Sequence, residues 1–236
     1  MNAPGPAPEA VRAHYAELAR AYDARANRAC NTAYRHLARE TLAGRRRVLE
    51  VGAGSGHLLA SLEARVRIAA DLSPHMLRAG AHRNRVARAA AEAARLPFPP
   101  ATFDGALSVN MLEHVADPRA VVAEAARVLQ PGAPLLLVTP NGGVAWLLET
   151  LERLRLKLPE GPHRFLDAPA LRALATPHFD VTTLRAFLAL PAGPGAFVRA
   201  VDRLAMGHGL FLYAVFRRRT HQQAPAASPS EGSSDT

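Results

Sequence analysis

The stretch that most constrains the fold of this chain is residues 48–56, Val-Leu-Glu-Val-Gly-Ala-Gly-Ser-Gly. Its apolar start suits a buried strand, and the apolar residues that follow it suit a helix. Between them, Gly52, Gly54 and Gly56 form a flexible turn. Because glycine has no Cβ, a ligand can lie directly against the backbone there. The amides at the start of the following helix would add a positive end. We therefore predict a strand, a ligand-binding turn and a helix.

The spacing of the glycines excludes three common loops. A dinucleotide fingerprint starting at Gly52 needs its third glycine where this chain has His57. A nucleophile elbow around Ser55 needs glycines at the positions of Ala53 and His57. A phosphate loop needs a Gly-Lys-Ser/Thr ending, which is absent. The remaining pattern is E-x-G-x-G-x-G, starting at Glu50.

Strands and helices alternate along the middle of the sequence. We predict strands over 47–51, 66–71, 86–90, 103–109 and 134–139, and helices over 56–63, 74–82 and 117–129. A helix over 168–175 and strands over 179–187 and 209–216 would complete the domain, while 10–42 reads as one or two helices. Leucines at helical spacing predict a further helix over 146–158. Such alternation argues for a parallel sheet with helices on both faces.

Composition narrows the class of protein further. A length of 236 residues suits one α/β domain. The N-terminus lacks the basic and apolar regions of a secretory signal, and no stretch approaches a membrane span, so we expect a cytoplasmic protein. The net charge of +9 comes from scattered arginines rather than one basic face, so we expect no nucleic-acid partner. Residues 1–9 and the polar tail 221–236 are expected to be disordered.

Four blocks of sequence, taken together, resemble the class I S-adenosylmethionine (SAM) dependent methyltransferases. The closest resemblance is to the small-molecule group that includes the ubiquinone and menaquinone methyltransferases (type 11). The blocks are Val48–Gly56, Ile68–Leu77 (IAADLSPHML), Ala91–Asp104 with Leu107–Asp117 (AEAARLPFPPATFD and LSVNMLEHVAD), and Val128–Asn141 (VLQPGAPLLLVTPN).

The resemblance implies a Rossmann-like seven-stranded sheet in the order 3-2-1-4-5-7-6, with the last strand antiparallel and helices on both faces. It implies one domain over 10–220, in which 10–42 is a helical lid over the cofactor and 143–178 is an insertion on the substrate side. Tyr22 is the better lid candidate, with Tyr15 beside it, although core packing explains either. The implied cofactor is SAM. Ligands of such sheets lie at the carboxyl ends of the strands.

Asp71, at the end of the second predicted strand, is the leading candidate for holding the cofactor ribose. A carboxylate there can accept hydrogen bonds from both ribose hydroxyls. The alternative is a helix cap, but Ser73 before Pro74 is the better cap for the helix that follows.

The other cofactor-binding candidates follow from the resemblance. Leu72 and Met76 would supply apolar walls for adenine, although Met76 also suits the core. Glu92 would contact the adenine amino group and the Ala93 amide the ring, although the family often carries Asp at the first position and a surface role explains Glu92 equally well. Glu50 would attract the cofactor ammonium group or organise loop amides. Two further candidates, at the end of the fourth strand, are Asn110 and Met111.

Methyl transfer depends chiefly on positioning and desolvation, and a base is needed only when the nucleophile arrives protonated. His114 and His163 are the candidates. For His114 we favour a structural role, capping the loop before the helix over 117–129. We expect His163 to lie nearer the substrate. The dispersed histidines and the lack of paired acidic residues predict a site without metal.

The leading hypothesis is therefore a metal-independent SAM-dependent methyltransferase acting on a small, apolar organic molecule. The alternatives are an RNA or protein methyltransferase, favoured only by net charge, and a non-catalytic SAM-binding partner protein. The sequence leaves the acceptor atom and the oligomeric state open.

Overall fold

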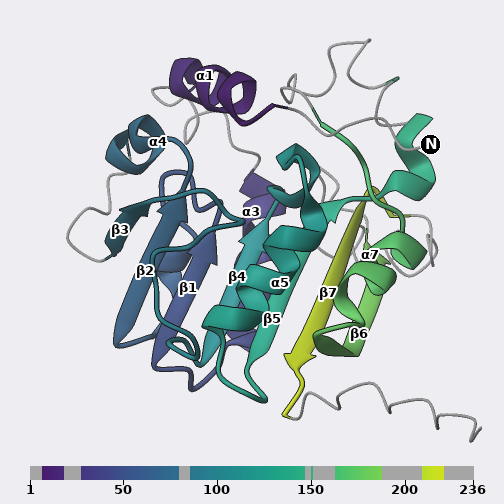
Figure 1. The fold of residues 1–236 in the computed structure, drawn as a ribbon. Helices are drawn as coiled ribbons and strands as arrows, with labels where there is room; N and C mark the ends of the chain where they lie inside the picture. The colour runs from purple at the N-terminus through teal and green to yellow at the C-terminus, as the bar shows by residue number, and fades with distance from the viewer. Residues whose placement is uncertain are drawn as a thin grey trace, which may run out of the picture.

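A seven-stranded sheet organises the molecule in the computed structural model, which describes residues 7–18, 28–79, 86–146, 150, 163–187 and 209–220. The strand order is β3-β2-β1-β4-β5-β7-β6, as expected. The strands are β1 (Arg47–Val51), β2 (Val66–Asp71), β3 (Ala87–Ala90), β4 (Gly105–Val109), β5 (Pro134–Pro140), β6 (Phe179–Phe187) and β7 (Phe211–Arg218). The first five pair in parallel, whereas β7 runs antiparallel to both β5 and β6. The parallel strands therefore end at one edge of the sheet, uppermost in Figure 1.

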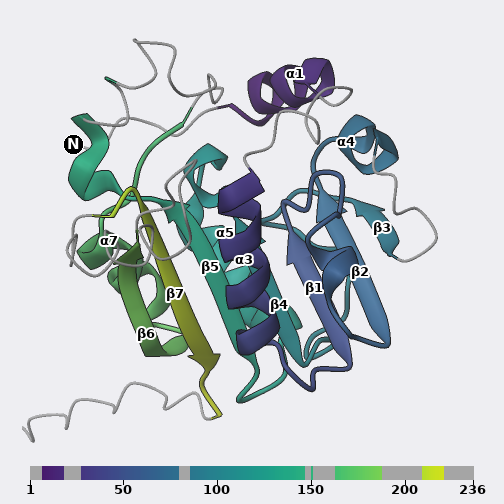
Figure 2. The same cartoon turned by 180° about the vertical axis from the view of Figure 1, so that it is seen from behind.

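Helices cover both faces of this sheet. Helices α5 (Pro118–Val128) and α7 (Ala168–Ala175) lie on one face, and α3 (Arg28–Thr41) crosses the other, as Figures 1 and 2 show from opposite sides. Along β5, Leu135 and Leu137 join the core beneath α5 and α7, whereas Leu136 and Val138 join the core beneath α3. Every residue of β5 is buried. Burial on both faces explains why this strand has a continuous apolar run rather than alternation.

The helix predicted over 56–63 is wrong. Only one 3-10 turn forms there, η1 (Leu59–Ser61), and Leu62 is already extended. The guanidinium group of Arg67 donates hydrogen bonds to the carbonyl oxygens of Ala60 and Leu62, at 3.3 and 3.0 Å. Those carbonyls therefore have partners without the continued helix that would otherwise bond them. The helix whose amides were expected to give a positive end after the glycines is therefore only a single turn long.

The remaining elements lie close to their predicted ranges, with one difference. Helix α1 (Pro8–Leu18) begins within the range expected to be disordered. Helix α4 (Pro74–Ala79) follows β2, as predicted. Two further 3-10 turns, η2 (Leu112–His114) and η3 (Gly142–Val144), follow β4 and β5. None of the helices in the described ranges has the length and apolar character needed to cross a membrane. Of the helix predicted over 146–158, only residues 146 and 150 are described. The tail 221–236 lies wholly outside the described residues.

Candidate active site

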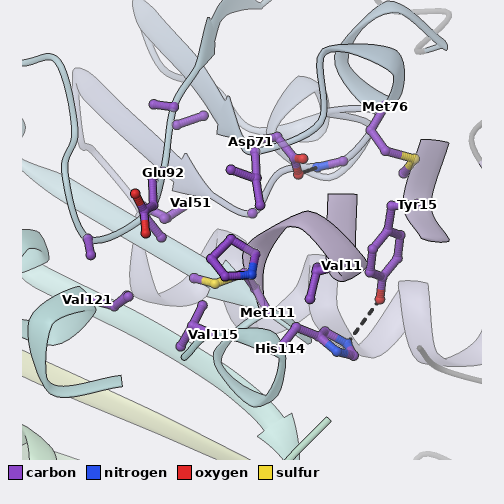
Figure 3. A pocket seen from close by; sticks show the side chains of 18 of the residues that line it. Val11, Tyr15, Val51, Asp71, Met76, Glu92, Met111, His114, Val115 and Val121 are labelled. Atoms are coloured by element: carbon purple, nitrogen blue, oxygen red, sulfur yellow. Dashed lines mark hydrogen bonds between the residues drawn. The ribbon is translucent and has the colours of Figure 1, made fainter. Parts of the chain in front are cut away.

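A pocket opens at the carboxyl ends of the parallel strands, beneath α1 (Figure 3). Its volume of about 170 Å³ far exceeds the roughly 10–15 Å³ that one water molecule needs, so it accommodates an organic ligand. Most of its lining is apolar. The predicted site residues that line it are Gly52, Gly54, Asp71, Leu72, Met76, Glu92, Ala93, Asn110, Met111 and His114.

The glycine turn after β1 brings the backbone up to this pocket. Gly52 adopts a φ of +72°, in the left-handed region that favours glycine. A Cβ at Gly52 would lie 2.2 Å from Cγ of Met111, so the missing side chain makes room for Met111. Sequence reasoning had assigned that space to a ligand. The glycine therefore serves the packing of two neighbouring strand ends as well as the approach of a ligand.

Asp71 lies at the tip of β2 and is fixed by two backbone amides. Its Oδ2 accepts a hydrogen bond from the amide of Gly54, and its Oδ1 accepts one from Ser73, both at 2.8 Å. Burial raises the pKa of the Asp71 carboxyl, against the lowering effect of these two amides. Ser73 is the cap of α4, because its Oγ accepts a hydrogen bond from the amide of Met76 at 3.4 Å. Each carboxylate oxygen keeps lone-pair capacity for a ligand donor.

Glu50 lies beneath the same turn but does not line the pocket. Its side chain is 3 % exposed, and its Oε2 accepts a hydrogen bond from the amide of Leu59 at 3.2 Å. This burial raises the pKa of Glu50 to about 8. Of the two roles expected for Glu50, the structure therefore displays the organisation of loop amides. Gly56 is also absent from the described lining.

The wall of the pocket near β2 and β3 is largely apolar. Met76, on α4, is buried and its methyl carbon lies 3.1 Å from the position of a Cβ on Gly54. Glu92 lines the pocket as an exposed side chain, at an isolated bridge with Arg95. The Glu92 carboxylate lies above and to the left of Met111 in Figure 3, on the opposite side of the pocket from Met76.

Asn110 and Met111 form the floor of the pocket at the end of β4. Asn110 adopts a φ of +49°, a conformation that asparagine tolerates better than most residues. Its Nδ2 donates a hydrogen bond to the hydroxyl oxygen of Tyr34 on α3, at 3.2 Å. This contact links the floor of the pocket to the helix on the opposite face of the sheet.

His114 faces the pocket and contacts helix α1. A hydrogen bond of 3.0 Å joins its Nε2 to the hydroxyl of Tyr15, across 99 positions of sequence, and is dashed in Figure 3. The carboxylate of Asp117, rather than His114, accepts hydrogen bonds from the first free amides of α5. The His114 imidazole is therefore placed for contact with a ligand.

His163 lies behind His114 and does not line the pocket. The two imidazole centroids are 6.4 Å apart, and the His163 ring stacks on Phe165 at 4.4 Å. The backbone holds this segment in place, since the amide of Arg164 donates a hydrogen bond to the carbonyl oxygen of Glu113 at 2.8 Å. The structure thus brings both candidate histidines together but gives only His114 access to the described pocket.

Sequence reasoning missed Glu113 and undervalued Tyr15. Glu113 is fully buried, and its Oε2 accepts a hydrogen bond from Oγ1 of Thr139 at 3.0 Å. Its Oε1 lies 3.9 Å from Nε2 of His114. A charged residue amid apolar neighbours, in Met111-Leu112-Glu113-His114, was the available signal. A carboxylate is seldom fully buried unless it is paired.

Two expected features fall outside the described residues. Tyr22, the preferred lid residue, and residues 147–149 and 151–162 of the insertion expected over 143–178 cannot be compared with the structure. Among the described ranges, no three His, Cys, Asp or Glu side chains are grouped as a metal site.

Comparison with known proteins identifies the fold and the domain. Residues 49–137 match the family model for a methyltransferase domain. A ubiquinone biosynthesis O-methyltransferase from Xanthomonas euvesicatoria is 35% identical over 135 residues, which cover 51% of this chain and 55% of that protein. The chain thus spans about half the length of the curated relatives it matches.

Solved structures agree on the fold. A SAM-dependent methyltransferase from Thermotoga maritima, described as a possible histamine N-methyltransferase, superposes with a TM-score of 0.68 at 18% identity, covering 89% of this chain and 99% of the other. The N-methyltransferase NodS from Bradyrhizobium japonicum, crystallised with S-adenosyl-L-homocysteine, gives 0.62 at 16% identity, covering 89% and 98%. Together with the strand order, these comparisons show that residues 49–137 match a methyltransferase domain and that the chain has the fold of solved SAM-dependent methyltransferases.

Proposed function

We propose that this protein transfers a methyl group from SAM to a hydroxyl oxygen of a small, apolar organic molecule. The proposal rests on one observation: a single pocket has a mostly apolar lining and also contains the Asp71 carboxylate and the His114 imidazole. The choice of oxygen rests on the O-methyltransferases that match half of the chain. The apolar character of the acceptor rests on the lining, which includes Val11, Val115 and Val121.

The residues of the pocket fit the proposed cofactor. The Asp71 oxygens are held by backbone amides at one end, with capacity left for the hydroxyls of a ribose. Leu72, Met76 and Ala93 offer apolar contact for an adenine ring. When bound, SAM supplies an electrophilic methyl carbon on a positively charged sulfur.

The chain's own residues then have three tasks. Met111 and the other apolar side chains exclude water from the reacting atoms. The strand ends hold the two ligands in line, which is the larger part of such catalysis. His114, at the pocket surface, is the base that becomes protonated when the acceptor hydroxyl loses its proton. We infer that His114, rather than His163, is the base, because His163 does not line the pocket.

The test is a labelling experiment. The purified protein is incubated with methyl-labelled SAM and with separate small-molecule, RNA and protein fractions of a cell extract. We expect label in an ether-linked small molecule and equimolar S-adenosylhomocysteine, both lost in an Asp71→Ala variant. Because the described residues group no metal ligands, we also expect an unchanged rate with a chelator.

The other outcomes identify the alternatives. Label in the RNA or protein fraction would contradict the proposed acceptor and support a macromolecular methyltransferase. SAM binding without S-adenosylhomocysteine in any fraction would indicate a non-catalytic partner protein.

A further inference from the structure

Tyr15, on α1, lines the pocket and contacts His114. Its ring meets the His114 ring edge to face, with centroids 5.5 Å apart, and its hydroxyl is 3.0 Å from Nε2. In Figure 3 the phenol descends from α1 to meet the imidazole at the pocket's edge. Lid function or core packing would explain an aromatic ring at this position. Neither explains a hydroxyl hydrogen-bonded to an imidazole nitrogen of a residue that lines the pocket.

Beyond His114, the contacts continue into the interior. Oε1 of Glu113 lies 3.9 Å from Nε2 of His114, and Oε2 of Glu113 is held by the Thr139 hydroxyl. Glu113 has no exposed surface, and in such an interior a carboxylate stabilises a neighbouring imidazolium strongly. Tyr15, His114 and Glu113 therefore form a row that leads from the pocket to a buried carboxyl group.

We propose that Tyr15 is a catalytic residue that relays the acceptor's proton to His114. The proposal rests on the proposed function. The acceptor oxygen forms a bond to the methyl carbon, and the carbon–sulfur bond breaks with its electron pair remaining on sulfur. The acceptor's proton passes to the Tyr15 oxygen while the Tyr15 proton passes to Nε2 of His114. The phenol ends neutral, and the resulting imidazolium lies beside Glu113.

The relay follows from the occupancy of the nitrogen. Nε2 already has the Tyr15 hydroxyl as its hydrogen-bond partner, so an acceptor in the pocket reaches the imidazole through that hydroxyl. Because Tyr15 belongs to α1, the acid–base centre is complete only when α1 lies over the pocket. Helix α1 contributes Pro8 and Val11 to the same wall. Helix α1 therefore supplies both part of the pocket wall and the hydroxyl that completes the acid–base centre.

The decisive variant is Tyr15→Phe, which keeps the ring and removes only the hydroxyl. We expect kcat in the small-molecule labelling assay to fall about 100-fold or more, as for loss of general base catalysis, with the SAM dissociation constant within twofold of the parent. A Tyr15→Phe/His114→Ala double variant should be no slower than His114→Ala alone, because both substitutions interrupt one relay. Tyr213→Phe, on β7, is the control for loss of a phenol oxygen elsewhere and should retain the parental rate.

A second measurement needs no acceptor. Nitrogen-15 NMR of the histidines should show the Nε2 resonance of His114 moving in Tyr15→Phe and not in Tyr213→Phe. A parental kcat in Tyr15→Phe would overturn the relay, and so would a loss of rate matched by an equal loss of SAM affinity, which indicates a lid alone. If the parent labels no small molecule, the proposed function fails and the catalytic role with it. The NMR comparison then still reports whether Tyr15 and His114 are bonded.

Discussion

The two ends of the pocket are built in different ways. At the β1–β2 end, the carboxylates of Glu50 and Asp71 are held by backbone amides no more than 17 positions away. At the β4–β5 end, His114 is held by a side chain 99 positions away, and Glu113 by Thr139. The first end is therefore a local structure that forms with its own strands and turn. The second is complete only after distant parts of the chain have packed together.

This difference suggests a division of labour. The β1–β2 end suits the binding of SAM, which stays the same whatever the acceptor is. Backbone amides hold their geometry independently of the acceptor. The other end draws on α1 and on the segment from residue 163, and such segments can vary without disturbing the sheet. Five substitutions and one deletion test this division.

The largest expected effect is at the β4–β5 end. His114→Ala should lower kcat by about 10²–10⁴-fold through loss of the base, while SAM affinity changes little. His163→Ala should have a smaller effect, because its ring lies behind His114. From sequence alone we had expected the opposite order. Steady-state kinetics with the labelled acceptor decide it, and a larger loss in His163→Ala would restore the original order.

At the β1–β2 end, Asp71→Ala should weaken SAM binding by roughly one to three orders of magnitude, since two charge-assisted hydrogen bonds are lost. The melting temperature without ligand should fall too, because Asp71 also accepts hydrogen bonds from the amides of Gly54 and Ser73.

Asp104→Ala is the matched control for Asp71→Ala. The Asp104 carboxylate also accepts two backbone hydrogen bonds, from Arg46 and Arg47 at 2.8 Å, but at the opposite edge of the sheet. It should lose stability and keep its SAM affinity in calorimetry. Equal SAM affinity in the two variants would show that Asp71 serves only the fold.

Glu50 provides a test of the buried carboxylate beneath the glycine turn. Its folded pKa of about 8 lies above the ordinary value of 4.5, so the folded protein holds a proton that the unfolded chain releases between these pH values. Stability from this group is complete below pH 4.5 and is lost as the pH rises toward 8, by about 1.4 kcal/mol per unit.

We therefore expect the free energy of unfolding of the parent to fall by about 2–3 kcal/mol more than that of Glu50→Gln between pH 6 and 8. Glutamine can still accept the hydrogen bond from the Leu59 amide without ionising. Denaturant titrations at each pH measure the difference. Parallel pH profiles in the two proteins would show that Glu50 is already ionised at pH 6.

The smallest expected effect is outside both pocket ends. Deletion of 221–236 should leave SAM affinity and the melting temperature unchanged, because this polar, proline- and serine-rich segment has little apolar surface to bury. A measurable loss of either would mean that the tail contacts one of the two ends and that the division into two regions is incomplete.

Local patterns in the sequence determined the sheet and the cofactor side. Apolar runs such as those of β1 and β5 mark strands buried on both faces, and the glycines and Asp71 follow strand ends that must meet at one edge. The helix over 56–63 was the exception. Its end depends on Arg67, whose guanidinium group bonds carbonyls that no helical pattern reveals.

The contacts at the β4–β5 end of the pocket were decided by the tertiary structure alone. Periodicity shows which residues share a face but not which distant side chains meet, so the contact of Tyr15 with His114 and that of Glu113 with Thr139 could not be foreseen. The same holds for Gly52, whose missing Cβ makes room for Met111, just beyond the end of β4, a strand that neighbours β1 only in the folded sheet. These pairings depend on the docking of whole elements, which is settled by packing across the molecule rather than by any short stretch of sequence.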